Sequence, residues 1–262
     1  MSKDPEAILF TDHRGDRCSL EDVIADGLDE DYSDRVGDLE ELLDHGTPYH
    51  GLLACVVLCS WGIPSGFRML ISWASAPDGA PWAGEPVVFA PHARIDGAFD
   101  LLADALRTSA YVDEGEELRE LQRDAARRLL AIYPSHFING AFIAFLGGKS
   151  DLRHQLAGDI VHTVDACIER IASGAEPGLD LPVRTAGLLG LLIAEDPQRA
   201  ADRSNRLLDL RPADTRMLHD LAYALGAGTD EQSAKVLLRL RDLAPSKIEP
   251  VVGKALDRRG LD

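Results

Sequence analysis

The spacing of apolar residues constrains the fold of this chain more than any other feature. From residue 19 to residue 256 they recur mostly at intervals of three and four, which places them on one face of an α-helix. The segment EELRELQRDAARRLLAIY shows this clearly, with one apolar stripe and a charged reverse face. Only EAILFT near the start and EPVVFA around residue 87 have the composition of extended segments. The sequence therefore predicts an all-α protein.

Start and stop signals divide the chain into many short helices. Ser19 and Asp22 approximate a capping box, and Gly46 ends the next apolar pattern. Thr47 and Pro48 have the preferred order of a cap followed by a first helical residue. The run GLLACVVLCSWGI that follows is apolar nearly all round, which predicts a central buried helix, and Ser65 can cap the helix after it. Later helices are expected over 116–133, 151–172, 183–194, 197–210, 215–225, 231–243 and 248–257.

Two similar heptapeptides near the C-terminus indicate a repeat. RLLDLRP at 206–212 and RLRDLAP at 239–245 share Leu-x-Asp-Leu-x-Pro at an offset of 33 residues. This period and the helix-ending proline resemble tetratricopeptide repeats, which are helix pairs of about 34 residues. The resemblance covers residues 183–258, where Arg184, Gly187 and Leu188 replace the first-helix signature of that family. The N-terminal helix pairs look more like HEAT repeats. Both resemblances imply stacked antiparallel helical hairpins, as in an α-solenoid, with an extended binding face.

The expected organisation is one all-α domain. It comprises acidic helices over 1–46, helical pairs over 47–75, a long loop rich in proline and glycine over 76–96, and a helical array over 97–262. The start lacks the pattern of a secretory signal, and the longest apolar run is shorter than the roughly 20 residues of a membrane span. Cys55 and Cys59 are interpreted as buried hydrophobic residues, with a redox or metal pair as the alternative. We expect a cytoplasmic protein of bacterial type.

Negative charge is concentrated at the N-terminus. The formal net charge is −17, and residues 1–50 hold 15 acids and four bases, a net −11. Residues 201–262 hold 10 acids and 11 bases, a net +1. Such a field repels nucleic acids and anionic membranes, so neither is expected as a partner, whereas a basic protein would be attracted. The alternative is that the acidity serves solubility alone.

Motifs for cofactors and metals are incomplete. GKS at 148–150 matches the end of a phosphate-binding loop, but Ile143 stands where that loop requires glycine. His154, Asp159, His162 and Asp165 could supply metal ligands, yet no second ligand pair at binding spacing is visible elsewhere. The sequence predicts no metal and no other cofactor.

All three tryptophans lie between residues 60 and 82. Trp61 and Trp73, on successive predicted helices, are interpreted as packing residues. Trp82 lies in SAPDGAPWAGEPVVFAPHARID, a structureless stretch of a length that is often functional. Two roles remain open for Trp82: an anchor pinned onto the helices, or a recognition residue.

These features favour a non-catalytic binding or adaptor protein with an acidic interaction surface. One specific form of the hypothesis is an inhibitor or immunity-type protein that masks a basic toxin or nuclease. The alternative is an enzyme whose site lies between helices near the 76–96 loop. The sequence does not define the oligomeric state. The candidate surface combines the loop with the acidic helices through Trp82, Asp78, Glu85, His92, Arg94, Glu40, Glu41 and Asp44.

Overall fold

The computed structural model is all-α, as predicted. It describes residues 4–29, 33–83, 97–112, 115–175, 179–243, 246 and 248–258. In these ranges it contains fifteen α-helices, and extended pairing is limited to one isolated bridge between Thr11 and Arg17. Where the sequence was interpreted as one domain, the contacts group into two compact units, Met1–Ile132 (unit 1) and Tyr133–Asp262 (unit 2).

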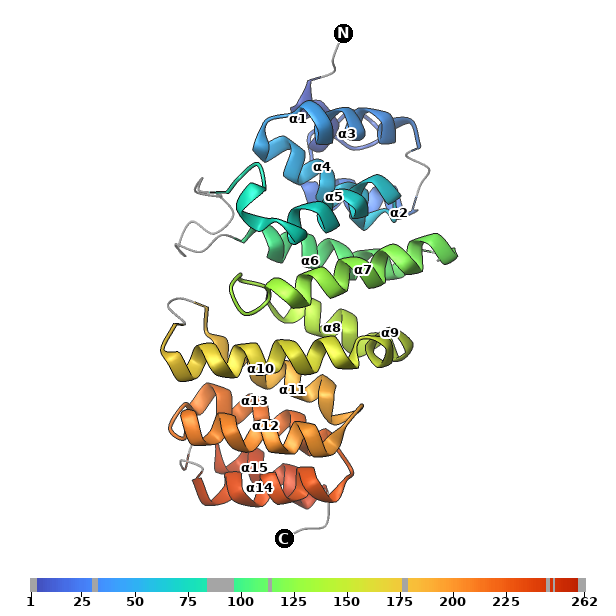
Figure 1. Cartoon of the computed structure of the whole chain (residues 1–262). Coiled ribbons are helices and arrows are strands. Elements are labelled where there is room, and N and C mark those ends of the chain that lie inside the picture. Colours follow the sequence, from blue (N-terminus) through green and yellow to red (C-terminus); the bar gives the residue numbers. More distant parts are fainter. Residues whose placement is uncertain are drawn as a thin grey trace. The chain divides into compact units, whose positions relative to one another are not determined.

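Unit 1 is built around one buried helix, α4 (Figure 1). All ten residues from Gly51 to Ser60 are buried, as the apolar run predicts, and Cys55 and Cys59 among them are free thiols. The surrounding helices α1, α2, α3, α5 and α6 all contact α4, and α7 packs on α5 and α6. The bounds are α1 (Pro5–Leu9), α2 (Leu20–Asp29), α3 (Ser33–His45), α4 (Pro48–Ser60), α5 (Pro64–Ser75), α6 (Ala98–Thr108) and α7 (Glu116–Ile132), with short 3-10 helices η1 (Pro77–Gly79) and η2 (Ser109–Tyr111).

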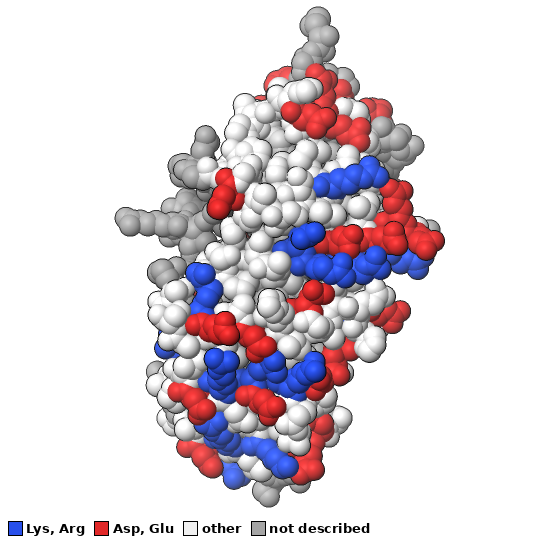
Figure 2. All heavy atoms as spheres, viewed as in Figure 1, with Lys and Arg blue, Asp and Glu red and all other residues white. Residues whose placement is uncertain are grey.

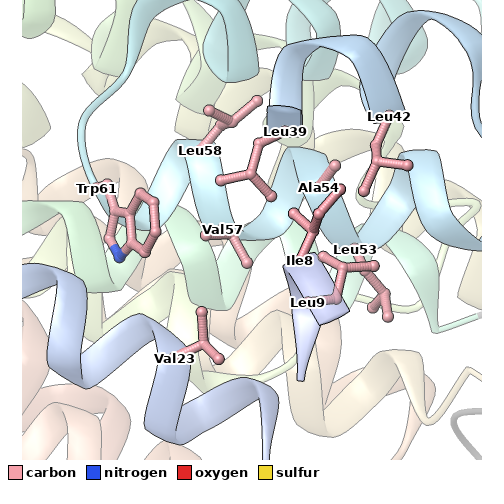
Figure 3. Close-up of a cluster of buried hydrophobic side chains, with 10 residues drawn as sticks. All are labelled: Ile8, Leu9, Val23, Leu39, Leu42, Leu53, Ala54, Val57, Leu58 and Trp61. Atoms are coloured by element: carbon pink, nitrogen blue, oxygen red, sulfur yellow. The ribbon is translucent and has the colours of Figure 1, made fainter. Parts of the chain in front are cut away.

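The core around α4 draws side chains from four neighbouring segments (Figure 3). Leu39 and Leu42 of α3 reach it from one side, and Val23 of α2 lies near Trp61. Burial of this kind stabilises a protein by about 25 cal/mol per Å² of apolar surface. The helices of the acidic segment are therefore packed around α4, and α1 also contacts α3.

The predicted helix starts of unit 1 are confirmed at two positions. The Asp22 amide donates to Ser19 Oγ (3.1 Å), and the Ser19 amide donates to Asp22 Oδ2 (3.0 Å), which is a reciprocal capping box. Thr47 Oγ1 accepts the His50 amide at the start of α4. Ser65 is not a cap: α5 already begins at Pro64 and has no side-chain cap. The fixed ring angle of proline suits the first helical position and explains this earlier start.

Gly46 ends α3 for a reason other than a left-handed backbone. It does not have a positive φ. Instead, a Cβ at this position would lie 2.4 Å from the Leu42 carbonyl oxygen, so only glycine permits the close turn into α4.

The extended interpretation of EAILFT is wrong. Residues Pro5–Leu9 form α1, because Asp4 caps the Glu6 amide (3.2 Å) and Pro5 occupies the first turn. The second such segment, EPVVFA at 85–90, lies outside the described residues.

Unit 2 consists of helices in two rows. Along one row α10 contacts α12 and α12 contacts α14, and along the other α11 contacts α13 and α13 contacts α15 (Figure 1). α8 packs on α11. The two heptapeptides end α12 at Leu210 and α14 at Leu243, as the repeat predicts. The bounds are α8 (Gly140–Gly148), α9 (Ser150–Gln155), α10 (Ala157–Ser173), α11 (Leu181–Ile193), α12 (Pro197–Leu210), α13 (Thr215–Ala227), α14 (Glu231–Leu243) and α15 (Glu249–Asp257).

Glycines bring the helices of the second row close together. A Cβ on Gly190 would lie 3.2 Å from the Ala224 side chain, and one on Gly226 would lie 2.9 Å from that of Ala255. These contacts fix the spacing of α11, α13 and α15, because a larger side chain at either glycine would push neighbouring helices apart.

Candidate functional site

Trp82 is buried in a cluster of aromatic rings. Only 3% of it is exposed, and its ring meets Trp73 of α5 edge-on, with centroids 4.6 Å apart. Phe99 of α6 packs on it at 5.9 Å. Trp61 has a separate packing role, because its Nε1 donates to the Ile24 carbonyl of α2 (3.1 Å). Of the two roles left open for Trp82, its burial supports the anchor, and its assignment to an exposed surface is corrected.

The other loop residues of the candidate surface do not form a site with the acidic helices in the described structure. Asp78 is exposed in η1 and has no ion pair among the described residues. Glu85, His92 and Arg94 lie outside the described residues. Of the predicted surface, the acidic residues of α3, Glu40, Glu41 and Asp44, are left as the candidate site.

The solvent face of α3 carries that acidic half. At 100° per residue, Asp34, Asp38, Glu41 and Asp44 lie within about 120° of one another, and the buried Leu39 is about 100° or more from each of them. Asp34, Glu41 and Asp44 are exposed, and Glu40 at the edge is partly exposed. We call the carboxylates of Asp34, Glu40, Glu41 and Asp44 the acidic face. Within the described parts of the chain none of these four is in an ion pair.

The one arginine of α3 forms hydrogen bonds with the segment that follows α1. Arg35 reaches back to the end of α1 and donates to the carbonyls of Thr11 (2.6 Å) and Asp12 (2.7 Å). Its hydrogen bonds therefore hold the loop after α1 in place. The side chains of Asp34, Glu41 and Asp44 are exposed to solvent.

Acidic residues elsewhere are paired much more often. Unit 2 holds 18 acids and 16 bases, and many of these form ion pairs between helices, such as Arg203 with Asp165 (2.6 Å) and Arg153 with Glu195 (2.7 Å). Unit 1 holds 26 acids and 11 bases, a net −15 against −2 for unit 2. Figure 2 shows Asp and Glu gathered over α1 and α3, and the two signs interleaved over α10, α12 and α14. In α1, Glu6 Oε2 lies 3.7 Å from Arg17 Nη2.

A hydroxyl–imidazole–carboxylate series joins the start of α4 to α1. Thr47 Oγ1 is 3.1 Å from His50 Nδ1, and His50 Nε2 is 3.8 Å from Glu6 Oε1. The residue types match a nucleophile, a base and an orienting acid. The Thr47 oxygen, however, accepts the His50 amide as the cap of α4, and the Glu6 side chain is half exposed. This geometry is that of a helix cap and not of a preorganised nucleophile.

The phosphate-binding and metal-binding motifs that the sequence suggested do not form such sites among the described residues. GKS follows the predicted helix α8 and not a strand, and the Lys149 ammonium lies 5.5 Å from the centre of the Phe145 ring. His154 Nδ1 lies 3.0 Å from Glu195 Oε2. The sequence predicted one continuous helix over 151–172, but the helix is interrupted at Leu156, which separates α9 from α10. In the described residues no three His, Cys, Asp or Glu side chains are grouped as metal ligands.

The sequence analysis did not identify two features described above, the position of Asp34 on the acidic face and the contact between Glu6 and His50. Asp34 lies seven residues before Glu41, so helical arithmetic would have placed it on the acidic face. The contact between Glu6 and His50 joins residues 44 positions apart, and no local pattern indicates it.

Comparison of the chain with protein-family models, with curated proteins and with solved structures finds no match. Among the described residues, no helix combines the length and apolar character needed to cross a bilayer.

Proposed function

We propose that this protein is a non-catalytic binding protein whose acidic face attracts a basic protein partner. The observation that carries the proposal is the difference between the units. Unit 1 has a net charge of −15, and four carboxylates of α3 face solvent without an ion pair in the described structure. Arg35, the one arginine of α3, donates to the carbonyls of Thr11 and Asp12. Unpaired surface charge of one sign accelerates encounter with a partner of opposite sign.

Within this class, an inhibitor or immunity-type protein that covers a basic toxin or nuclease fits the charge best. Such a partner would present Lys and Arg around its own functional site, and the acidic face would orient it before close contact forms. The stacked helical hairpins, which resemble tetratricopeptide and HEAT repeats, would supply the extended contact area. We place the protein in the cytoplasm of a bacterium.

The alternative, an enzyme with a site near the 76–96 loop, has less support. Trp82, which that hypothesis places at the site, is packed against Trp73 and Phe99. The proposed function does not require this loop.

The test compares matched variants in binding to a defined basic probe, poly-lysine. Neutralising the acidic face with Glu41→Gln and Asp44→Asn should slow association and flatten its dependence on salt, because surface charges act chiefly on the encounter rate. Glu169→Gln with Asp202→Asn removes two exposed carboxylates of unit 2 and is the matched control. Equal slowing by both double variants would mean that only net charge matters, and would overturn the assignment of the surface to α3.

A further inference from the structure

Gly37 lies in the solvent face of α3, and neither its backbone nor its packing calls for a glycine. Its φ is not positive, and a Cβ on it would have no atom within 4 Å. Two other helical glycines of unit 1 differ, because a Cβ on Gly27 would overlap the Trp61 ring and one on Gly66 would lie 2.7 Å from the Cys59 nitrogen. Glycine is among the least favourable residues inside a helix. Gly37 therefore weakens α3 without a packing role in the described structure.

Three exposed carboxylates share the solvent face of α3 with Gly37. At 100° per residue, Asp34, Glu41 and Asp44 lie inside an arc of about 80°. Gly37 lies inside the same arc and is about 160° from the buried Leu39. The three acids and the glycine are all exposed. The face is thus a stripe of negative charge in which one position has no side chain.

The spacing of these acids along α3 matches that of a second helix. A rise of about 1.5 Å per residue places Glu41 about 10.5 Å and Asp44 about 15 Å from Asp34 along the axis. Basic residues at positions i, i+7 and i+10 of another helix have the same separations and also lie within about 80°. Residues on one face of an extended strand recur at about 6.7 Å, which fits the three separations poorly.

We propose that the solvent face of α3 binds a basic helix of the partner protein, with the closest approach at Gly37. Lys or Arg side chains at helical spacing pair with Asp34, Glu41 and Asp44, and this charge complementarity sets the register of the partner helix. The distance between two packed helices depends on the side chains at their contact, so the bare position at Gly37 lets the partner come close to α3. This inference deepens the proposed function and rests on it, because it concerns the same acidic face.

The first measurement compares two alanine-rich helical peptides of about 20 residues and identical composition. One peptide carries its lysines at i, i+3, i+7 and i+10 on one face, and the other distributes them around the helix. Circular dichroism verifies that both are equally helical. The full chain should bind the one-faced peptide roughly fivefold more tightly, as expected for three aligned surface ion pairs. Equal affinity for the two peptides would overturn the inference, because net charge alone would then explain binding.

The second measurement places a side chain at the bare position. Gly37→Gln adds an uncharged group and a better helix former, so the urea midpoint should rise. Binding of the one-faced peptide should weaken roughly threefold or more, because the peptide is held away from the acids. Gly158→Gln is the matched control, since Gly158 is an exposed glycine of α10 with no atom within 4 Å of a Cβ, and it should leave binding unchanged. Unaltered affinity in Gly37→Gln would contradict the close approach.

A third variant separates the inference from the proposed function. If Glu41→Gln with Asp44→Asn binds the one-faced peptide as tightly as the unaltered chain, the acidic face does not bind basic molecules and both proposals fail. If this double variant weakens binding of the two peptides equally while Gly37→Gln has no effect, the proposed function stands and the basic helix is ruled out. Weaker binding by a Gly37→Gln variant of raised stability supports the inference, because unfolding does not explain it.

Discussion

Arg184 and Tyr133 hold each other through three contacts inside unit 2. The Arg184 guanidinium carbon lies 4.1 Å from the centre of the Tyr133 ring, a cation–π distance. Arg184 Nη2 donates to the Tyr133 carbonyl (2.8 Å), and the Tyr133 hydroxyl donates to the Arg184 carbonyl (3.3 Å). The guanidinium also donates to the carbonyls of His136 (2.9 Å) and Ile138 (3.0 Å). A buried cation on α11 therefore fixes the segment that precedes α8.

Replacing Arg184 should destabilise the protein strongly. Arg184→Met keeps the apolar stem but leaves several buried carbonyls without donors, so we expect a loss of about 3 kcal/mol or more in the free energy of unfolding. Tyr133→Phe removes one hydroxyl bond and should cost about 1 kcal/mol. Urea denaturation measures both. Arg206→Met, an exposed arginine of α12, should change stability by less than about 0.5 kcal/mol, and a similar loss in both arginine variants would contradict the buried role of Arg184.

Local signals predicted the helices, but not what Arg184 does. Caps and apolar spacing act over four residues, so Ser19, Thr47 and the ends of α12 and α14 were found from the sequence. Arg184 appeared only as a departure from a repeat signature. Its acceptors at Ile138 and Tyr133 lie 46 and 51 residues away, a distance over which the sequence carries no readable pattern.

Part of the candidate site could also be predicted from local signals, and part of it could not. Glu40, Glu41 and Asp44 lie on a helix whose exposed side follows from its apolar residues, so their exposure could be predicted. Trp82 lies outside any periodic segment, and its burial depends on Trp73 and Phe99 from two separate helices. Tertiary contacts therefore decide between the two roles that the sequence left open for Trp82.

Trp82→Ala should lower stability markedly. Truncating a fully buried aromatic residue costs about 3–5 kcal/mol, because packing is lost and a cavity remains. The melting temperature should therefore fall by several degrees, and Trp82→Phe should fall less. Tyr111→Ala is the control, since 77% of Tyr111 is exposed. An unchanged melting temperature for Trp82→Ala would return this residue to a surface role.

Two helical glycines of unit 1 should respond to alanine in opposite directions. A Cβ on Gly27 of α2 would lie 2.2 Å from the Trp61 ring, whereas nothing lies within 4 Å of one on Gly37 of α3. Gly27→Ala should cost about 1–3 kcal/mol through overpacking. Gly37→Ala should stabilise by roughly 0.5–1 kcal/mol, because alanine favours the helix. Denaturant titration of the pair tests the contact between α2 and Trp61, and equal effects would contradict it.

Cysteine reactivity should follow burial. Burial raises the pKa of the Cys167 thiol to about 11, and it raises that of Cys55 well above its usual range. Because the thiolate is the reactive form, neither should be alkylated in the folded protein. Cys18 is partly exposed, although burial and nearby acids also raise its pKa, so it should react slowly and before the others. Mass spectrometry after iodoacetamide treatment, with and without urea, measures the order, and rapid native labelling of Cys55 would contradict the buried position of α4.

Glu195 should make unit 2 sensitive to acid. Burial raises the pKa of this carboxyl, but hydrogen bonds from Arg153 (2.7 Å) and His154 (3.0 Å) outweigh burial and lower it below its usual value. An acid with a lowered pKa in the folded state binds fewer protons there than in the unfolded state. Its contribution to stability is therefore present above pH 4.5, the ordinary value of the group, and is lost as the pH falls through the lower folded value.

Glu195→Gln isolates that contribution. The variant should be less stable than the unaltered chain at neutral pH, and the difference should shrink as the pH falls below about 4.5, because the carboxylate is then protonated in the unaltered chain as well. Glu169→Gln, at an exposed position of α10, should show a small difference that changes little with pH. Urea midpoints measured across this range provide the comparison. A difference for Glu195→Gln that stays constant down to the lowest pH would mean that the ion pair with Arg153 does not contribute through its charge.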